Sequence, residues 1–465
     1  MTGEDAATAR VALAGLLAGA GLPRQAAAVD FAGTDAALPG PHRLAAAMAA
    51  AIGAQAAAVG EIWRLRTGRG QRVSVGLQDA ADALNPADHL RVHGHPCTIR
   101  FVHTEPGNGF WRAGCGRWIY MAHGSPRLRN GLLELLDCAN ARPAIARAVA
   151  SRDALALEAQ AQARGLPLVC VRDRDTWRAH PHGARLAERP VVEIERIADG
   201  PPRPFEPCAR PLGDLRVLEC THVLAGPGTG RCLAEQGADA LRIAPPRTSD
   251  PVNFQIDTGF GKRSAFLDLD QARDLDRLRA LAADADVVVQ SLRPGALARR
   301  GLDAASLAAG HRGLVTVSIS CYGLDDGPWS RHVGYDPVAQ SATGIAVTEG
   351  GADAPRVVPC TLLADYLTAY LAAFGALAAL IRRATTGGSW QVRVSLARTC
   401  TWVQDLGLRA PGAAPAERAT PPRLLAMDSP FGALQYLAPV ARYDETPAGW
   451  ARPPEPLGAS PPRWL

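Results

Sequence analysis

The chain has 465 residues, of which 47% are apolar, 20% charged and 5% aromatic. This composition is that of a globular protein and excludes wholesale disorder, and the length is enough for two or three domains. The 50 basic and 45 acidic residues leave a net charge of +5, and Lys262 is the single lysine. So small a charge, without a basic block or an RNA-binding aromatic motif, predicts no nucleic-acid partner.

The start of the chain and its cysteines indicate a cytoplasmic protein without a metal. None of the ten cysteines forms a C-x-x-C pair, so we expect reduced thiols and no zinc or iron–sulfur site. Glu4 and Asp5 stand where a signal peptide needs a cationic stretch. The two most apolar runs, 44–60 and 366–381, are short and rich in alanine, which predicts buried helices rather than membrane spans.

Two segments of the chain resemble each other. Residues 60–80 and 379–399 align without a gap at an offset of 319 and share the pattern R-x-x-T-G…V-x-V-x-L. Each follows an alanine-rich apolar stretch. Because the shared pattern does not consist of alanine, it predicts a partial duplication rather than a chance similarity.

Composition divides the chain into four parts. Residues 1–80 are the partial repeat with its alanine-rich helices, and 81–205 mix short strands with helices, as in a small α+β domain. We expect strands at 118–121 and 168–171 and a helix over 144–163. Residues 206–407 follow a proline-rich linker and form a Rossmann-like domain, and 408–465 are a proline-rich tail that wraps the surface or packs on another subunit.

A regular alternation of strands and helices marks the third part. Apolar strands are expected at 215–220, 240–243, 285–290 and 314–320, with helices at 229–236, 271–283 and 303–309 between them. Strands without polar alternation indicate a parallel sheet that is covered on both faces, so the fold class is α/β. Ligands of such sheets bind at the carboxyl ends of the strands.

The first of these strands runs into a glycine-rich stretch, in which Gly226, Gly228 and Gly230 form G-x-G-x-G. Small residues at this place let backbone amides approach a phosphate at a helix N-terminus, but the same pattern also suits a tight strand-to-helix turn. The chain contains no Walker A sequence, so ATP-driven chemistry is not indicated.

Two further loops carry cations. Lys262 and Arg263 precede a short strand expected at 265–269, where adjacent cations can clamp a phosphate or simply form a solvated turn. A second loop follows the strand at 285–290 and has the geometry of an anion site. Its candidate residues are Ser291, Leu292, Arg293 and Arg299.

Asp365 is the most distinctive single residue. It stands where an apolar helix is expected to begin, and the next sixteen residues carry no charge. A carboxylate among apolar neighbours needs a partner or a function. The helix dipole can keep it ionised, and an ionised carboxylate can act as a nucleophile, although a helix cap is an equally simple explanation.

These motifs together resemble family III CoA-transferases, the carnitine and formyl-CoA transferase group. The resemblance rests on five stretches in the family's order: P-L-G-D-L-R-V-L-E…L-A-G-P…L-A-E-Q-G-A-D-A-L-R-I from 211, G-K-R-S…L-D-L at 261–269, A-D-V-V-V-Q-S-L-R-P-G at 285–295, V-S-I-S at 317–320 and G-Y-D-P-V-A-Q at 334–340. The clear match covers about 211–405. Residues 46–200 are similar to the family's post-catalytic half, so the usual order is rearranged.

The resemblance implies a nucleophile, a CoA site and a homodimer. Asp365 matches the family's nucleophilic aspartate, whereas the leading copy has Ala46 at that position. The residues expected to bind CoA, as a substrate rather than a permanent cofactor, are His222, Leu224, Ala225, Gly226, Lys262, Arg263, Ser291, Leu292, Arg293 and Arg299. The chain departs from the pattern at Ala369, where glycine is usual, and at 244–246, where an acidic residue is missing.

The family also contains α-methylacyl-CoA racemases, which carry a histidine where this chain has Tyr335. Because an unperturbed tyrosine, with a pKa of about 10, is a poor base near neutral pH, this favours transfer over racemisation. We therefore expect an acyl-CoA:carboxylate CoA-transferase that works through an aspartyl-CoA thioester. The alternatives are a racemase, a non-catalytic CoA-binding protein and a plain nucleotide-binding scaffold.

Overall fold

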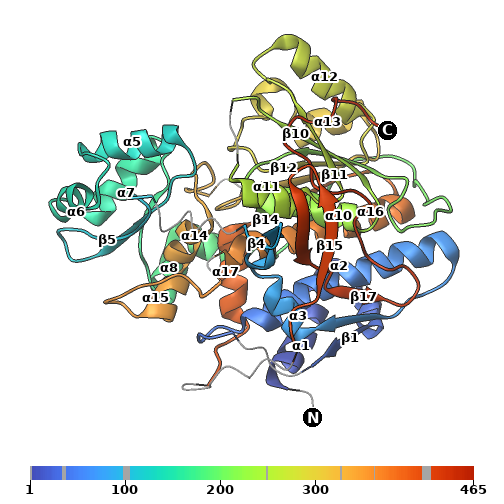
Figure 1. Cartoon of the computed structure of the whole chain (residues 1–465), viewed down its shortest axis with the longest axis horizontal. Coiled ribbons are helices and arrows are strands. Elements are labelled where there is room, and N and C mark those ends of the chain that lie inside the picture. The colour runs from blue at the N-terminus through green and yellow to red at the C-terminus, as the bar shows by residue number, and fades with distance from the viewer. Residues whose placement is uncertain are drawn as a thin grey trace.

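The structure is a computed structural model of the whole chain (Figure 1). It describes residues 3–33, 38–97, 105–247, 250–324, 327–360, 362–410 and 420–465. The molecule is mixed α/β, with one large, mainly parallel sheet and three smaller sheets. In Figure 1 a small domain containing β5, α5, α6 and α7 stands apart from the body that holds the large sheet.

The large sheet has the order β11-β10-β9-β12-β13-β14-β8. All its pairings are parallel except the last, in which β8 runs antiparallel to β14. In chain order the six parallel strands read 3-2-1-4-5-6, which is the doubly wound arrangement of dinucleotide-binding folds. Its strands are β8 (Glu193–Ala198), β9 (Arg216–Cys220), β10 (Asp239–Ala244), β11 (Lys262–Phe266), β12 (Val287–Gln290), β13 (Val315–Ser320) and β14 (Ser389–Ser395).

Helices cover both faces of this sheet, as its continuous apolar strands require; Val287, Val289 and Val317 are fully buried. The helices of this part of the chain are α10 (Ala225–Glu235), α11 (Val252–Gly259), α12 (Ala272–Ala283), α13 (Ala304–Gly310), α14 (Asp336–Thr343), α15 (Ile345–Gly350), α16 (Leu363–Thr386) and α17 (Leu396–Asp405), with the short 3-10 turn η3 (Ala298–Arg300). The strands and helices expected between 215 and 320 are confirmed, within a few residues at their ends.

The glycine-rich stretch lies inside a helix and not in a loop. Helix α10 begins at Ala225, four residues before the expected start, so all three glycines belong to it. A Cβ on Gly226 would lie 2.7 Å from Ser291 Oγ, one on Gly228 would lie 2.8 Å from Ala369 Cβ, and one on Gly230 would overlap Glu219. The glycines therefore let α10 pack closely on three sides, and Gly228 makes room for the alanine of α16.

The small domain contains the sheet β5-β6-β7. Its strands at Trp118–Met121 and Leu168–Cys170 agree with expectation, but the helix expected over 144–163 is wrong, because it is broken in two. Asp153 accepts hydrogen bonds from the amides of Leu155 and Ala156 and so starts a second helix. The elements are β5 (Gly109–Arg112), β6 (Trp118–Met121), α5 (Pro126–Leu136), α6 (Arg142–Ala150), α7 (Ala154–Ala163), β7 (Leu168–Cys170), α8 (Arg174–Ala179) and α9 (Pro181–Ala187).

The two ends of the chain form shared sheets. The tail contains a β-hairpin, not anticipated from its prolines, that extends β3 and β4 into a four-stranded sheet, while β17 joins β1 and β2. Figure 1 shows the red tail strands beside the blue leading elements. The elements are α1 (Glu4–Gly19), η1 (Pro23–Ala28), β1 (Val29–Ala32), α2 (Leu44–Thr67), β2 (Val73–Gly76), α3 (Leu77–Asp82), η2 (Pro86–His89), β3 (Arg91–Val92), β4 (His95–Pro96), β15 (Leu424–Ser429), β16 (Gly432–Leu437) and β17 (Ala441–Tyr443).

The offset of 319 recurs in the structure. Helices α2 and α16 are both 24 residues long, begin 319 residues apart and pack against each other. The three-stranded sheet β1-β2-β17 repeats the order and polarity of β13-β14-β8, with one parallel and one antiparallel pairing. The partial duplication itself stays a prediction.

Helices α2 and α16 are also long and apolar enough to cross a membrane, but 89% and 100% of their most hydrophobic windows are buried inside the protein. That burial is typical of core helices, as the sequence predicted. The ten cysteines are free thiols, six of them buried.

The contact between α10 and α16 can be tested by substitution. Gly228→Ala should lower the free energy of unfolding by about 1–3 kcal/mol, because its new methyl group would lie 2.8 Å from that of Ala369. Gly228→Ala combined with Ala369→Gly should recover most of the loss, measured by urea denaturation. Gly15→Ala, in a helix with open space around it, is the control and should not destabilise. A double variant as unstable as the single one would contradict this packing.

Candidate functional site

Asp365 lies in the first turn of α16, where it is buried with 7% of its surface exposed. Its carboxylate accepts a hydrogen bond from the backbone amide of Ala225, the first residue of α10. The nucleophile candidate and the stretch after β9 are thus in contact. The acid is held by another segment of the chain and not by its own helical turn.

Asp336 is the immediate partner of this acid. It begins α14, and its Oδ2 accepts the backbone amide of Asp365 at 2.7 Å, with further hydrogen bonds from the amide of Ala364 and the side chain of Gln340. The residue before α16, Leu362, offers no capping side chain. Asp336 therefore supplies the cap of α16 from a distant position in the sequence.

The two carboxyl groups share a low-dielectric environment. Burial raises the pKa of Asp365 well above its usual value, and the nearby charge of Asp336 raises it further. Burial also raises the pKa of Asp336, opposed by the hydrogen bonds that it accepts. Because Asp336 has more donors than Asp365, the proton that the pair retains lies preferentially on Asp365 in the free protein.

The turn that connects β9 to α10 is held in a strained conformation. Val223 has a φ of +66°, which is unfavourable for a β-branched residue. Its amide donates to Asp250 Oδ2 at 2.9 Å, and Asp250 is itself paired with Arg242 of β10. The amide of His222 donates to Ser291 Oγ at 3.3 Å. These contacts fix the turn and direct the amide of Ala225 at Asp365.

Lys262 and Arg263 do not form the expected phosphate clamp. Lys262 is buried and donates to both oxygens of Glu219 and to the carbonyl of Pro227, while burial lowers its pKa to about 8. Arg263 pairs with Asp239 at the amino end of β10. Both charges are neutralised inside the protein, so we correct this expectation: Lys262 supports the first turn of α10, and Arg263 lies at the other edge of the sheet.

The other predicted residues lie at the carboxyl edge. Arg293 and Arg299 follow β12, and their side chains are exposed, with no carboxylate partner among the described residues. His222 is exposed on the adjacent turn, and Leu224 and Gly226 are buried where α10 begins. Ser291 contacts that turn, and the amide of Leu292 donates to Gln290. The strand order reverses between β9 and β12, which is where such sheets bind ligands.

Sequence reasoning missed Asp336 as a site residue. The signal was present in the G-Y-D-P motif at 334–337, where an acid at the start of a helix would be buried beside apolar residues. Its partner Asp365 lies 29 residues away, so spacing alone did not join them. Across the described ranges, no group of three His, Cys, Asp or Glu side chains could hold a metal ion.

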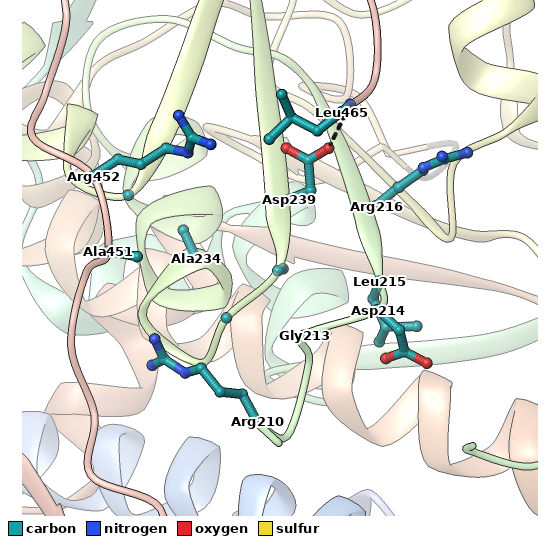
Figure 2. Close-up of a pocket in the computed structure, with 13 residues that line it drawn as sticks. Arg210, Gly213, Asp214, Leu215, Arg216, Ala234, Asp239, Ala451, Arg452 and Leu465 are labelled. Atoms are coloured by element: carbon teal, nitrogen blue, oxygen red, sulfur yellow. Dashed lines mark hydrogen bonds between the residues drawn. The ribbon is translucent and has the colours of Figure 1, made fainter. Parts of the chain in front are cut away.

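A cavity of about 400 Å³ lies at the opposite edge of the sheet (Figure 2). The starts of β9 and β10 line it with Arg216 and Asp239, and the C-terminal segment carries Arg452 along it. The amide of Leu465 donates to Asp239 at 3.3 Å. Because ligands of doubly wound sheets bind at the carboxyl edge, this cavity is not the place where Asp365 would act.

Part of the chain is similar to known proteins. Residues 212–433 match the family described as CoA-transferase family III. An acetyl-coenzyme A transferase, nodX, from Hypoxylon pulicicidum is 37% identical over 44% of this chain and 35% of its own length. A succinyl-CoA–D-citramalate CoA-transferase from Chloroflexus aurantiacus is 31% identical over 40% of this chain and 49% of its own.

Among solved structures, a CAIB/BAIF family protein from Brucella suis is similar over 48% of this chain and 65% of that chain, with 28% identity and a TM-score of 0.40. The chain spans at most about half the length of the curated relatives that it matches. The segment that matches the family model includes Asp365.

The buried acid pair predicts how stability depends on pH. Since the pKa of Asp365 is raised on folding, the native state binds its proton more tightly, and the protein loses stability as pH rises above about 4. Asp365→Asn should remove this pH-dependent loss of stability, because the asparagine amide does not ionise. At pH 8 the variant should exceed the wild type in free energy of unfolding by at least about 1.4 kcal/mol, the value of one pKa unit, and the difference should vanish below pH 4. Thermal or urea denaturation measures it.

Asp303→Asn provides a control of opposite sign. Hydrogen bonds from Ser306 lower the pKa of Asp303, so its ionised form stabilises the protein above the unfolded pKa. That variant should be less stable than the wild type at pH 8, and the two should converge as pH falls. If Asp365→Asn behaved in the same way, the acid pair as described here would be wrong.

Proposed function

We propose that the chain is an acyl-CoA:carboxylate CoA-transferase in which Asp365 carries the CoA group as a thioester. The observation that supports this most directly is the buried carboxylate of Asp365 against the amide of Ala225. The site lies at the edge of the sheet where ligands bind, in the segment that matches CoA-transferase family III. Relatives named as CoA-transferases are consistent with acyl-CoA and a small carboxylate as substrates.

The reaction begins with attack by Asp365 on the thioester carbonyl of the donor. A C–O bond forms, the C–S bond breaks, and the products are a mixed anhydride and the CoA thiolate. The thiolate then attacks the Asp365 carbonyl, which releases the donor's carboxylate and leaves an aspartyl-CoA thioester. The acceptor carboxylate attacks this thioester, and the thiolate released finally attacks the acceptor's carbonyl and frees Asp365.

The surrounding amides suit the charges that develop in these steps. Each attack at the Asp365 carbonyl places negative charge on its oxygen, where the amide of Ala225 donates. The strained turn at Val223 and the cap from Asp336 hold donor and acid in place before substrate binds. One thioester is exchanged for another, so the reaction is nearly neutral in energy and needs no ATP.

Racemisation fits the site less well. Burial, with the nearby charges of Asp250 and Asp365, raises the pKa of Tyr335 to about 12 despite the cation of Arg293. A phenol with so high a pKa does not abstract an α-proton near neutral pH. Together with transfer we propose a homodimer in the cytoplasm that holds no permanent cofactor.

The nucleophile is tested by removing its charge. Asp365→Asn keeps the shape of the side chain and its acceptor for the Ala225 amide, so CoA binding should remain while transfer falls by at least about 10³-fold. Transfer is followed from a range of acyl-CoA donors to small carboxylates. With the wild type and a donor, hydroxylamine should leave a hydroxamate on the peptide that contains Asp365. Asp303→Asn should transfer normally, and turnover by Asp365→Asn would exclude the mechanism.

The rate of the first half-reaction should depend on pH. Asp365 must be ionised to attack, and both burial and Asp336 raise its pKa. The rate of thiolate release should therefore increase with pH, with a midpoint well above the value of about 4 for a free aspartate. Single-turnover measurement with a thiol reagent reports it. A rate that is constant between pH 5 and 9 would contradict the raised pKa.

A further inference from the structure

In the part of the chain that the structure describes, three exposed arginines without a side-chain partner, Arg127, Arg164 and Arg293, lie close to one another. Most arginines that approach the interior are paired with acids; the pairs are Arg66–Asp214, Arg172–Glu158, Arg242–Asp250, Arg263–Asp239 and Arg383–Asp286. Within the described ranges, the guanidinium groups of Arg127, Arg164 and Arg293 make no hydrogen bond or ion pair. A cation that is left without an acid in such a protein is available to a ligand.

Two of these arginines line a cavity, and the third, from a distant part of the chain, lies beside it. Arg127 and Arg164 line a cavity of about 400 Å³ on the small domain, beside Gly165. Arg293 belongs to the loop after β12, and its Nη1 lies 3.5 Å from the position that a Cβ on Gly165 would occupy. The small domain therefore brings two cations to the carboxyl edge of the large sheet.

The charges at this place repel one another. Burial lowers the pKa of Arg293, and the positive charge of Arg127 lowers it further. Glu134 also lines the cavity, but within the described ranges it forms no ion pair with these arginines, and the two arginines of the lining outnumber it. An anion bound between the arginines would relieve the repulsion, and guanidinium groups bind the oxygens of a phosphate in pairs.

The same face of the small domain also contacts the acid site. The amide of Gly124 donates to the hydroxyl of Tyr335, which lies near both Arg293 and Asp365. A ligand that reaches Asp365 from the carboxyl edge therefore passes between the large sheet and the small domain. CoA is such a ligand, because its thioester end is neutral and its phosphates lie at the far end of the pantetheine arm.

We propose that Arg127 and Arg164 of the small domain join Arg293 to bind a phosphate group of the CoA substrate. The proposal rests on the proposed CoA-transferase function and goes beyond it, because it makes the leading part of the chain half of the substrate site. The segment with alanine in place of the nucleophile then contributes binding and not chemistry.

The test compares CoA with pantetheine, which lacks the phosphates, by calorimetry on the full chain. Arg127→Gln with Arg164→Gln should weaken CoA binding by about 10- to 100-fold, and binding of pantetheine should stay unchanged. Arg147→Gln is the matched control, since Arg147 is exposed on α6 of the same domain and away from the cavity. It should bind both ligands as the wild type does. The substituted side chains are exposed, and equal melting temperatures would verify that the variants fold.

The outcomes separate the two proposals. If the double variant binds CoA as tightly as the wild type, or loses pantetheine and CoA alike, the phosphate site is overturned and the transferase proposal stands. If the wild type binds neither CoA nor pantetheine, the CoA-transferase proposal itself is overturned, and the phosphate site with it. Selective loss of CoA in the double variant alone supports the site.

Discussion

The hydrogen bond from the backbone amide of Asp365 to the carboxylate of Asp336 organises the site. It joins the N-termini of α14 and α16, and the bond from Ala225 to Asp365 adds the start of α10. Two carboxyl groups in one buried place are unfavourable unless amides and helix ends stabilise them. Three helices, α10, α14 and α16, thus meet at Asp365. Helices α10 and α16 contribute backbone amides of their first turns, and α14 contributes the side chain of its first residue, Asp336. The packing of α10 on α16 follows from this geometry.

The sequence was sufficient to predict those parts of the fold and of the site that depend on residues close together along the chain. Continuous apolar strands such as Val287–Gln290, alternating with helices, predict a doubly wound sheet, and one charge at the head of an apolar helix identifies Asp365. The sequence was insufficient to predict contacts between side chains that lie far apart along the chain. From the sequence alone, Lys262 is expected to be an exposed cation. Its partner Glu219 stands 43 residues earlier on β9, and the fold brings the two side chains together across β10. Pairing across a sheet depends on strand order, which spacing does not encode.

The glycine-rich stretch shows the same limit. G-x-G-x-G fits both a phosphate loop and close helix packing, because both need the absence of a Cβ. Only the neighbours decide: Gly228 faces Ala369 and Gly230 faces Glu219, so these two glycines serve packing. Ala369, where the family usually has glycine, and Gly228 therefore explain each other. A methyl group on one of the two helices leaves no room for a methyl group at the facing position of the other.

The order of the segments along the chain has a physical consequence for the site. Helix α2 of the leading segment has the length of α16 and begins 319 residues before it, but it has Ala46 where α16 has Asp365. It is followed by the small domain, whose Gly124 reaches Tyr335 beside the acid of the later segment. The small domain carries the contact with Tyr335, and the later segment carries the acid. Because they are covalently joined, the effective concentration of one for the other is fixed by the chain, and a single polypeptide assembles the site around Asp365.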